Sequence, residues 1–536
     1  MPKTKLLMCA ESSHIKSGFG LYTREILTRL YNSGHFDIAE LSCYSVTGNE
    51  ANVPWKVYPN AVGPNDERAK GYASNPINAF GLWRFDRVVL DFQPDIVFDM
   101  RDYWMFSYQE TSALREYFNW VIAPTVDSLP QNPDWMNTYK NADLVLAHTD
   151  WAIEYMSQAN MGIKTGKAVS DSVDTNTYSP ISHSKNFHKH KFTIPQDSFV
   201  IGSVMRNQKR KLIPNLFGCL KKLIQYTNNH DIFLYLHTSY PENTGWDIPG
   251  YLQEYGVYNN VLFTYYCLGC KSIHASCFQG SEKICPKCKQ KKCRLPSVNN
   301  GPNDLQLAEI YNTFDFYVQY AICEGLGIPQ LEAASCGIPV CSVDYSAMSE
   351  VTTKLDAYKV SYALHREMET GSLRAVPNDS HLVQIIYDYM KLNESEKYKV
   401  QEKMRNNIVE HYSWDKTANV LIEQLLELKP KNKWDDPLLT NHELKVPSSL
   451  GNREFVEFLV QHIIKSPFLL KTNFIQKMIK NLDDGVHVAP NSTTIYNREK
   501  AVKILENVLN AKISLKDIKA GKVKNEEDFI LIANGK

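Results

Sequence analysis

Short apolar runs alternate with helix-length amphipathic segments along the first 180 residues of the chain. The predicted strands are Lys5–Ala10, Phe36–Leu41, Ile96–Met100, Trp120–Pro124 and Asp143–His148. The predicted helices include Tyr22–Tyr31 and Trp151–Asn160. Strands that are separated by helices are typical of a parallel, doubly wound sheet.

A second series of the same kind begins at Phe199. Its predicted strands are Phe199–Val204, Ile232–His237, Val261–Tyr266, Phe316–Ile322 and Val340–Val343. The expected fold class is therefore α/β, with two Rossmann-like halves joined near Pro180–Pro195. Ligands of such sheets bind beyond the carboxyl ends of the strands, so the cleft between the halves is the expected site.

We expect the chain to divide into two large domains and a smaller unit. Residues 1–180 form the first domain and residues 195–410 the second, which is interrupted by an insertion at 265–300. Residues 411–429 have the apolar spacing of one amphipathic helix. After a linker, residues 440–536 keep a helical spacing that predicts a small helical unit for packing or oligomerisation.

Length and charge narrow the class of protein. At 536 residues the chain is too long for one hydrophobic core. Lys+Arg and Asp+Glu are equal at 59 each, so no global field recruits nucleic acid or an anionic membrane. The first apolar run is too short for a signal peptide, and no segment approaches the ~20 apolar residues of a spanning helix. These features predict a cytoplasmic protein without a membrane span.

The segment EGLGIPQLEAASCGIPV, residues 324–340, follows a predicted strand and combines a glycine loop with a helix. Pro329 fits the first helical turn and Gly337 fits the end. The N-terminus of such a helix has free N–H groups and a partial positive charge, which suit a phosphate. Glu324 and Glu332 flank this point, and sugar or ribose hydroxyls are the partners expected for them. The alternative is an ordinary strand–turn–helix with surface glutamates.

A basic segment, RNQKRK, follows the predicted strand Phe199–Val204. A diphosphate leaving group needs positive charge in place when its bond breaks. An arginine can clamp two oxygens and a lysine can act as a point charge. The alternative is a basic surface turn, and Lys209 and Arg210 fit that alternative better.

The first domain offers weaker candidates at the ends of its predicted strands. Gly18 and Gly20 open a helix after Lys5–Ala10, where glycine permits a close approach of backbone to ligand. Asp102 and Asp127 follow two further strands and are expected to point into the cleft. For Asp127, the better of the two, a turn carboxylate that caps the next segment is the alternative.

Glu324 and Glu332, with Gly325, Gly327 and Pro329 between them, resemble the nucleotide-sugar signature of the GT4-like retaining glycosyltransferases, which have the GT-B fold. The resemblance implies transfer of a sugar from a nucleotide-sugar to a hydroxyl acceptor, with retention at the anomeric carbon and no catalytic metal. This is the chemistry of a hexosyltransferase-type enzyme.

The same resemblance implies a role for each candidate. Arg206 and Lys211 would hold the departing diphosphate, Glu324 would hydrogen-bond the transferred sugar, and Glu332 would accept from the ribose hydroxyls. The implied site residues are Glu324 and Asp127 at the reacting centre and, for donor binding, Gly18, Gly20, Arg206, Lys211, Gly325, Leu326, Gly327 and Glu332. The base and sugar of the donor stay open, and so does the acceptor: a glycan, a lipid-linked sugar, a protein, a small molecule or a modified nucleobase.

The insertion carries a second motif, which lies outside the resemblance. Cys267, Cys270, Cys285 and Cys288 form two CxxC pairs with the spacing of a zinc ribbon. Four thiolates leave no open position, so a zinc ion there would be structural. Three further residues are reserve ligands: Cys277, Cys293 and His274. The second half of the insertion is basic and is a candidate macromolecular contact.

Two other functions stay open. One is a different GT-B enzyme that shares the donor site. The other is a non-catalytic scaffold of the same fold, which binds a partner or nucleic acid through the zinc ribbon and the C-terminal unit. The presence of Glu324, Glu332, Arg206 and Lys211 together favours an enzyme.

Overall fold

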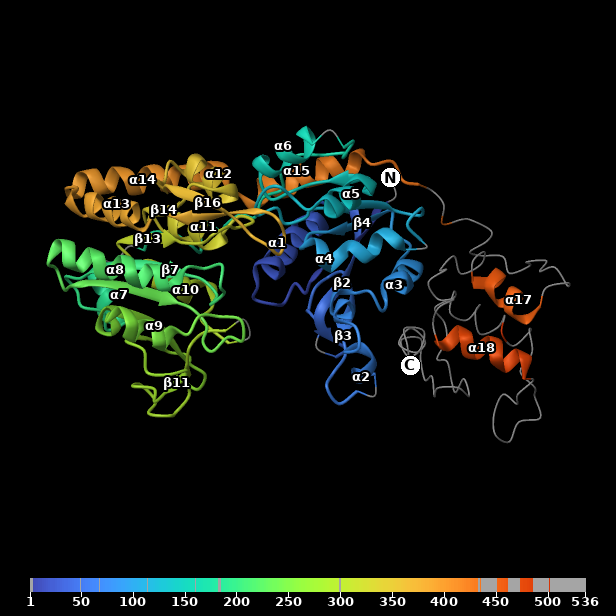
Figure 1. Cartoon of the computed structure of the whole chain (residues 1–536), viewed down its shortest axis with the longest axis horizontal. Coiled ribbons are helices and arrows are strands. Elements are labelled where there is room, and N and C mark those ends of the chain that lie inside the picture. Colours follow the sequence, from blue (N-terminus) through green and yellow to red (C-terminus); the bar gives the residue numbers. More distant parts are fainter. Residues whose placement is uncertain are drawn as a thin grey trace.

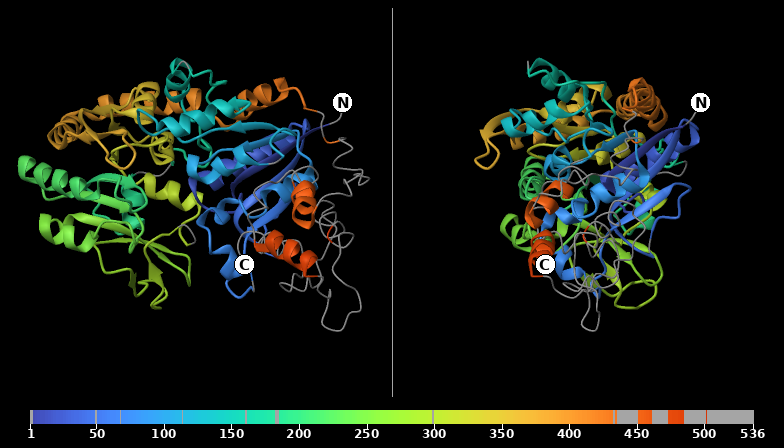
Figure 2. Two further views of the ribbon diagram at one scale, coloured as in Figure 1. Left: turned by 45° about the vertical axis from the view of Figure 1, so that its right-hand side comes forward. Right: turned by 90° about the vertical axis from the view of Figure 1, so that its right-hand side faces the viewer.

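Two parallel β-sheets organise the protein, and Figures 1 and 2 show them side by side with helices around each. The computed structural model describes residues 3–48, 50–66, 68–112, 114–159, 161–181, 185–297, 300–431, 434, 451–460, 473–484 and 501. In Figure 1 the first sheet lies near the centre of the view and the second lies to its left.

The first sheet is parallel throughout, with the strand order β3-β2-β1-β4-β5-β6. Its strands are β1 (Thr4–Glu11), β2 (Phe36–Val46), β3 (Lys56–Ala61), β4 (Ile96–Asp99), β5 (Asn119–Ile122) and β6 (Leu144–Val145). Its helices, with two short 3-10 helices, are α1 (Gly18–Asn32), α2 (Ala69–Tyr72), η1 (Pro76–Phe80), α3 (Phe85–Phe92), α4 (Tyr103–Phe106), η2 (Ser107–Thr111), α5 (Pro133–Asn141) and α6 (Asp150–Gln158). The order reverses between β1 and β4, which opens a crevice at their carboxyl ends.

Alternation along the strands gives this sheet two apolar faces. Leu7 and Cys9 of β1 pack against α3, α5 and α6 on one face. Leu6 and Met8 pack against α1 on the other face, together with a helix from the end of the second domain. Because successive side chains of a strand point to opposite faces, a strand that is apolar at every position is buried on both sides.

The second sheet repeats this order as β9-β8-β7-β13-β14-β15, again parallel. Its strands are β7 (Phe199–Val204), β8 (Ile232–His237), β9 (Val261–Cys267), β13 (Phe316–Gln319), β14 (Val340–Val343) and β15 (Tyr358–Val360). The helices of this part are α7 (Lys185–Lys191), α8 (Ile213–Thr227), α9 (Ile248–Tyr255), η3 (Tyr258–Asn260), α10 (Asp304–Tyr311), α11 (Ile328–Ser335), α12 (Ser346–Leu355), α13 (Asp379–Lys391) and α14 (Glu394–His411). Helices α8, α9 and α13 cover one face, and α10, α11, α12 and α14 cover the other.

Antiparallel strands extend the second sheet at β9, inside the cysteine-rich insertion. They are β10 (Ile273–Ser276), β11 (Glu282–Lys283) and β12 (Cys293–Arg294). Both β10 and β12 pair with β9, and β11 pairs with β12. A separate hairpin, β16 (Tyr362–Arg366) and β17 (Leu373–Pro377), follows β15.

The structure confirms the predicted α/β class and the two parallel sheets. Strands β7, β8 and β14 span the residues that the sequence predicted. Other predicted strands were too long at their carboxyl ends, since β5 ends at Ile122, β6 at Val145 and β13 at Gln319. The residues beyond these ends form loops at the crevice, where apolar side chains are also buried.

The structure has one helix within the predicted range 411–429, and this helix begins three residues later than predicted. Helix α14 ends at His411, and α15 (Trp414–Glu427) begins after Tyr412 and Ser413. Ser413 has an extended backbone (φ −121°, ψ 128°), which breaks the helix. The apolar face of α15 then packs against α1 on the first sheet, so the chain returns to the first domain.

Within the described residues of the region 440–536, the structure has two short helices. They are α17 (Asn452–Phe458) and α18 (Asn473–Asp483), joined by a hydrogen bond from Asn452 to Asp483 of 3.0 Å. The rest of the predicted helical unit, apart from a few neighbouring residues, lies outside the described part of the chain. Among the described helices, none has the length and apolar character needed to cross a bilayer.

Candidate functional site

Loops from both sheets line one cavity of about 560 Å³. They follow β1, β5 and β6 in the first sheet, and β7, β8 and β13 in the second. The cavity brings together most of the predicted site residues: Gly18, Arg206, Lys211, Glu324, Gly325, Leu326, Gly327 and Glu332. Gly20 and Asp127 do not line it.

The glycine loop between β13 and α11 brings the two domains close together. Gly327 caps α11 with a left-handed backbone (φ 93°, ψ 66°), and a proline follows in the first helical turn. A Cβ atom on Gly325 would lie 2.6 Å from Thr125 Cγ2 of the first domain. Only glycine therefore allows this approach of the two domains without a shift.

Glu324 is 4% exposed and is held by cations and an amide. Lys211 forms a close ion pair with Glu324 Oε1, and Gln319 Nε2 donates to the same oxygen over 2.7 Å. Arg210 Nη2 lies 3.5 Å from Oε2. Burial, together with the nearby Arg210 charge, lowers the pKa of Lys211.

Glu332 lies on α11 and is 7% exposed. Tyr311 Oη donates to Glu332 Oε2 over 2.7 Å, and Tyr178 is a second donor. Burial raises the pKa of Glu332 to about 7, although both tyrosines favour the ionised form. The carboxyl group therefore changes charge near neutral pH.

Arg206 is the most exposed of the predicted phosphate ligands. Its guanidinium makes two contacts with the Glu242 carboxylate, at 3.2 and 3.1 Å. The Arg206 hydrogen bond is the main cause of the lowered pKa of Glu242, which also accepts from Ser239. Without donor, both predicted cations are thus engaged by carboxylates.

The loop after β1 places its two predicted glycines differently. Gly18 lines the cavity at the start of α1. A Cβ atom on Gly20 would lie 2.4 Å from the Ile15 carbonyl oxygen, within the loop itself. Gly20 N donates to Ser17 Oγ, the N-cap, over 3.1 Å. Gly20 therefore shapes the loop and is not among the residues that line the cavity.

Asp127 also lies elsewhere than predicted, at the contact between the two domains. Arg374 Nη1 of the β17 strand donates to Asp127 Oδ1 over 2.8 Å, and the Cys323 thiol lies 3.2 Å from Oδ2. Arg374 is also bound to Glu367, at 2.8 Å. These contacts hold the carboxylate against the second domain, and Asp127 does not line the cavity. The other candidate of this kind, Asp102, does not line the cavity either.

The cavity contains a histidine and an aspartate that the sequence analysis did not select. His148 is buried and follows β6, and its Nδ1 lies 2.8 Å from Asp171 Oδ2. The position of His148 at the end of a predicted parallel strand was an available signal. Asp171 has no such signal, because it lies on the irregular segment that leads to the second domain.

Known structures share this arrangement. A sucrose-phosphate synthase from Thermosynechococcus elongatus superposes with a TM-score of 0.57 at 14% identity, over 80% of this chain and 100% of that chain. HepE from Anabaena, solved with UDP and glucose, gives 0.54 at 13% identity over 79% and 100%. An E. coli trehalose-6-phosphate protein bound with UDP-2-fluoro glucose gives 0.53 at 12% identity over 80% and 100%.

These proteins match the present chain in its fold of two parallel, Rossmann-like sheets. The chain has the GT-B fold. At these identities the likeness extends to the fold and no further. No protein-family model matches the sequence, and no curated protein matches it.

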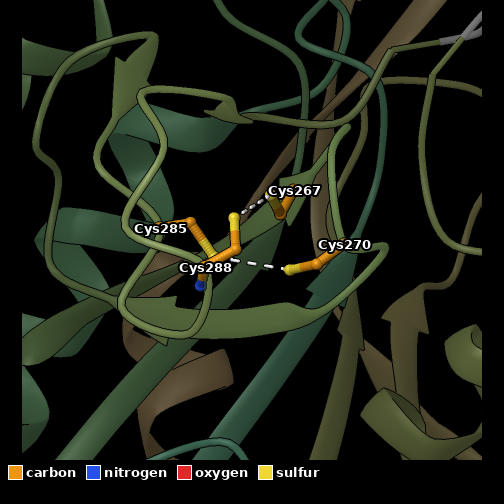
Figure 3. Close-up of side chains that lie close together, drawn as sticks. All are labelled: Cys267, Cys270, Cys285 and Cys288. Carbon is orange, nitrogen blue, oxygen red and sulfur yellow. Dashed lines mark hydrogen bonds between the residues drawn. The ribbon is translucent and has the colours of Figure 1, made fainter.

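The second domain carries the cysteine cluster. Figure 3 shows the four sulfurs of the two CxxC pairs pointing toward one another. Cys267 Sγ lies 3.6 Å from Cys288 Sγ, and Cys270 Sγ lies 3.7 Å from Cys285 Sγ. Four sulfurs about 2.3 Å from a central zinc ion are about 3.8 Å apart in a tetrahedron. The cluster therefore has the dimensions of a four-cysteine metal site.

The reserve ligands lie at different distances from this cluster. His274 and Cys293 form a second group that shares Cys285. His274 Nε2 is also hydrogen-bonded to Ser272 Oγ, at 2.8 Å. Cys277 belongs to neither group among the described residues, and its thiol instead faces the Asn259 carbonyl at 3.7 Å.

The insertion reaches the cavity through its last residues. Strand β12 pairs Cys293 with Cys267 of β9. The chain then continues directly to Pro296 and Ser297, which line the cavity, and Gly301 and two residues of α10 complete that wall. The cysteine cluster thus stands at the base of one side of the cavity.

Proposed function

We propose that this protein is a GT4-like retaining glycosyltransferase, which transfers a sugar from a nucleotide-sugar to a hydroxyl acceptor. One observation carries the proposal: a single cavity between two Rossmann-like sheets collects two cations, a helix N-terminus and two buried carboxylates. Each of these groups matches one part of a nucleotide-sugar.

Positive charge in the cavity suits the diphosphate. When the bond between the anomeric carbon and the diphosphate breaks, negative charge develops on the leaving oxygen. Arg206, Lys211 and the N-terminus of α11 provide fixed positive charge on that side of the cavity. The acceptor oxygen then bonds to the anomeric carbon on the face that the diphosphate leaves, and its proton passes to the departing phosphate.

The two carboxylates suit hydroxyl groups. Glu324, beside the glycine loop, hydrogen-bonds the transferred sugar, and Glu332 accepts from the ribose hydroxyls. No side chain is assigned as a nucleophile, so rate acceleration rests on positioning and electrostatics. Uridine is the base that we propose to test first, since the similar HepE structures hold UDP and UDP-glucose.

The test is a thermal-shift panel with UDP, GDP, ADP and CDP on wild type and Glu332→Ala. A ligand at ~100 times its dissociation constant adds about 2.7 kcal/mol to the stability of the folded state. We expect one nucleotide to raise the melting temperature of wild type and to have little effect on Glu332→Ala. Glu402→Ala, which removes an exposed glutamate of α14, is the matched control and keeps the full shift.

A folded wild-type protein that responds to none of the four nucleotides would contradict the proposal. If a nucleotide binds, the corresponding UDP- or GDP-sugar is incubated with the protein and the anomeric configuration of the product is read by NMR. Inversion of that configuration would contradict the retaining mechanism, while the proposed transferase activity would still hold.

We further propose that Cys267, Cys270, Cys285 and Cys288 hold a structural zinc ion. Their spacing, mutual distances and lack of an open position support this assignment. Zinc would tie β9 to the loop of the second CxxC pair. The check is metal analysis of the purified full chain, with about one zinc ion per chain expected and none if the thiols are unmetallated.

A further inference from the structure

An exposed group of aromatic side chains lies on the first domain, beside the cavity and outside the donor site described above. Tyr44 is 42% exposed and Trp104 is 45% exposed. Both stand edge-to-face to the buried ring of Phe80, with centroids 6.2 and 4.8 Å from it and interplanar angles of 82° and 90°. We call Tyr44, Phe80 and Trp104 the aromatic platform.

The backbone holds the platform in an unusual conformation. Tyr44 has φ 65°, a left-handed value that is uncommon outside glycine, and the β2–β3 register shifts between Ser42 and Val46. Such a bulge re-aims a side chain, and bulges are over-represented beside active sites. The exposure of Tyr44 is thus a product of a specific local distortion.

The support beneath the platform is rigid. Arg101 is fully buried, donates from Nη1 to the Phe80 carbonyl over 3.0 Å, and forms an ion pair with Asp99. Tyr108 Oη donates to the same carbonyl over 3.0 Å. A fixed base lowers the entropic cost of ligand binding, since fewer groups are ordered when the ligand arrives.

The platform is continuous with the donor cavity. Phe19, at the start of α1, packs against the cluster that contains Phe80 and also lines the cavity. A molecule seated on Tyr44 and Trp104 therefore lies next to the space assigned to the transferred sugar. This is the place from which a hydroxyl group can approach the anomeric carbon.

Carboxyl groups beside the platform define the polarity of its ligand. Glu11 ends β1 and accepts a hydrogen bond from Ser17, and burial together with the nearby Asp102 charge raises its pKa. Burial raises the pKa of the Tyr44 hydroxyl, and the nearby Glu11 carboxylate adds to this change. Carboxylates accept hydrogen bonds from hydroxyl groups, and they repel phosphate and carboxylate groups.

The two arginines that act on Glu11 are themselves bound to other carboxylates. Arg101 is bound to Asp99, and Arg206, which acts on Glu11, is bound to Glu242. A ligand that offers an apolar C–H face to aromatic rings and hydroxyl donors to carboxylates is a neutral pyranose.

We propose that the aromatic platform is the acceptor site of this enzyme and that it binds an uncharged saccharide, with one sugar ring against Trp104 and Tyr44 and hydroxyl groups directed to Glu11 and Asp102. The assignment rests on the proposed glycosyltransferase function. It names the acceptor class, which the donor cavity alone leaves open.

The test uses the full chain on an array of neutral, sialylated and phosphorylated glycans, in the presence of the nucleotide that shifts the melting temperature. Wild type binds neutral glycans. Trp104→Ala weakens that binding at least tenfold, Trp104→Leu does the same because it keeps apolar area without a ring, and Trp104→Phe retains most of it. Tyr398→Ala, which removes an exposed tyrosine of α14, is the matched control and binds as wild type does.

The nucleotide-induced thermal shift separates this proposal from the proposed function. All four variants keep that shift if they are folded and the donor cavity is intact. If wild type keeps the shift but binds only phosphorylated or sialylated glycans, or no glycan, the proposed acceptor role of the aromatic platform is contradicted. The proposed donor site is then unaffected. If no nucleotide raises the melting temperature of wild type, the proposed function itself is contradicted.

Discussion

Replacement of Glu332 by glutamine separates the two consequences of a buried carboxyl group: its cost to stability and its use in binding. Glutamine has nearly the same size, and its oxygen still accepts from Tyr311, which donates over 2.7 Å in wild type. Glutamine carries no charge at any pH. The variant therefore removes ionisation and leaves packing in place.

The magnitude follows from the pKa of Glu332, which burial raises from 4.5 to about 7. The folded state binds the proton more tightly than the unfolded state, so the carboxyl group lowers stability as pH rises through this window. One pH unit corresponds to about 1.4 kcal/mol, so the full effect is about 3 kcal/mol. At pH 5 the variant and wild type have similar free energies of unfolding, and at pH 8 Glu332→Gln is more stable by about 2 to 3 kcal/mol.

Nucleotide binding changes in the opposite direction. An ionised Glu332 accepts from the ribose hydroxyls, and hydrogen bonds to a charged group contribute about 1.5–3 kcal/mol each. We expect UDP to bind Glu332→Gln at least tenfold more weakly at pH 8, and to bind wild type more tightly as pH rises through 7.

Urea unfolding and calorimetric titration with UDP, each at pH 5, 6, 7 and 8, measure both effects. Glu402→Gln is the control, and both its stability and its affinity track wild type. A variant that shows no gain in stability at pH 8 refutes the raised pKa. A variant that is stabilised but binds UDP normally refutes the contact with ribose.

Three other changes test separate parts of the site. Lys211→Met lowers the free energy of unfolding, measured in urea, by about 3 kcal/mol, because it leaves Glu324 buried without its main cation. The double variant Lys211→Met/Glu324→Gln regains most of that stability, while its donor turnover stays absent. Gly325→Ala places a methyl group against Thr125 and lowers turnover at least tenfold, and Thr125→Ser, which removes the opposing methyl, restores most of it in the double variant. Cys288→Ser lowers the zinc content measured by metal analysis and weakens nucleotide binding severalfold, while Cys277→Ser changes neither.

The donor side of the cavity could be predicted from the sequence, because the local sequence pattern and the tertiary position of its residues agree there. A buried strand, a glycine loop and a proline at the first helical turn follow one another in the sequence. The positions of Glu324 and Glu332 relative to the loop therefore depend on local sequence and not on tertiary packing. The basic segment with Arg206 and Lys211 follows the neighbouring strand of the sheet. Carboxyl ends of adjacent parallel strands meet at one edge, which brings these residues together.

Contacts between distant segments could not be predicted in the same way. Asp127 is bound by Arg374, which lies more than two hundred residues further along the chain. Gly20 carries the same composition signal as Gly18, yet only its three-dimensional surroundings show that the loop carbonyl of Ile15 closes over it. Asp171 contributes to the cavity from a segment without periodicity.

Each predicted cation of the donor site is paired with a carboxylate, and this pairing affects which ligand the site favours. Lys211 is bound to Glu324 and Arg206 to Glu242 before a ligand enters. A diphosphate that draws Lys211 away would leave Glu324 as a buried carboxylate with one amide donor and a more distant arginine, which is a costly state. The hydroxyl groups of the attached sugar can satisfy that carboxylate, whereas a free nucleoside diphosphate cannot. In the proposed mechanism the two ion pairs therefore favour the intact nucleotide-sugar over its own leaving group, and departure of the diphosphate restores the Lys211–Glu324 pair.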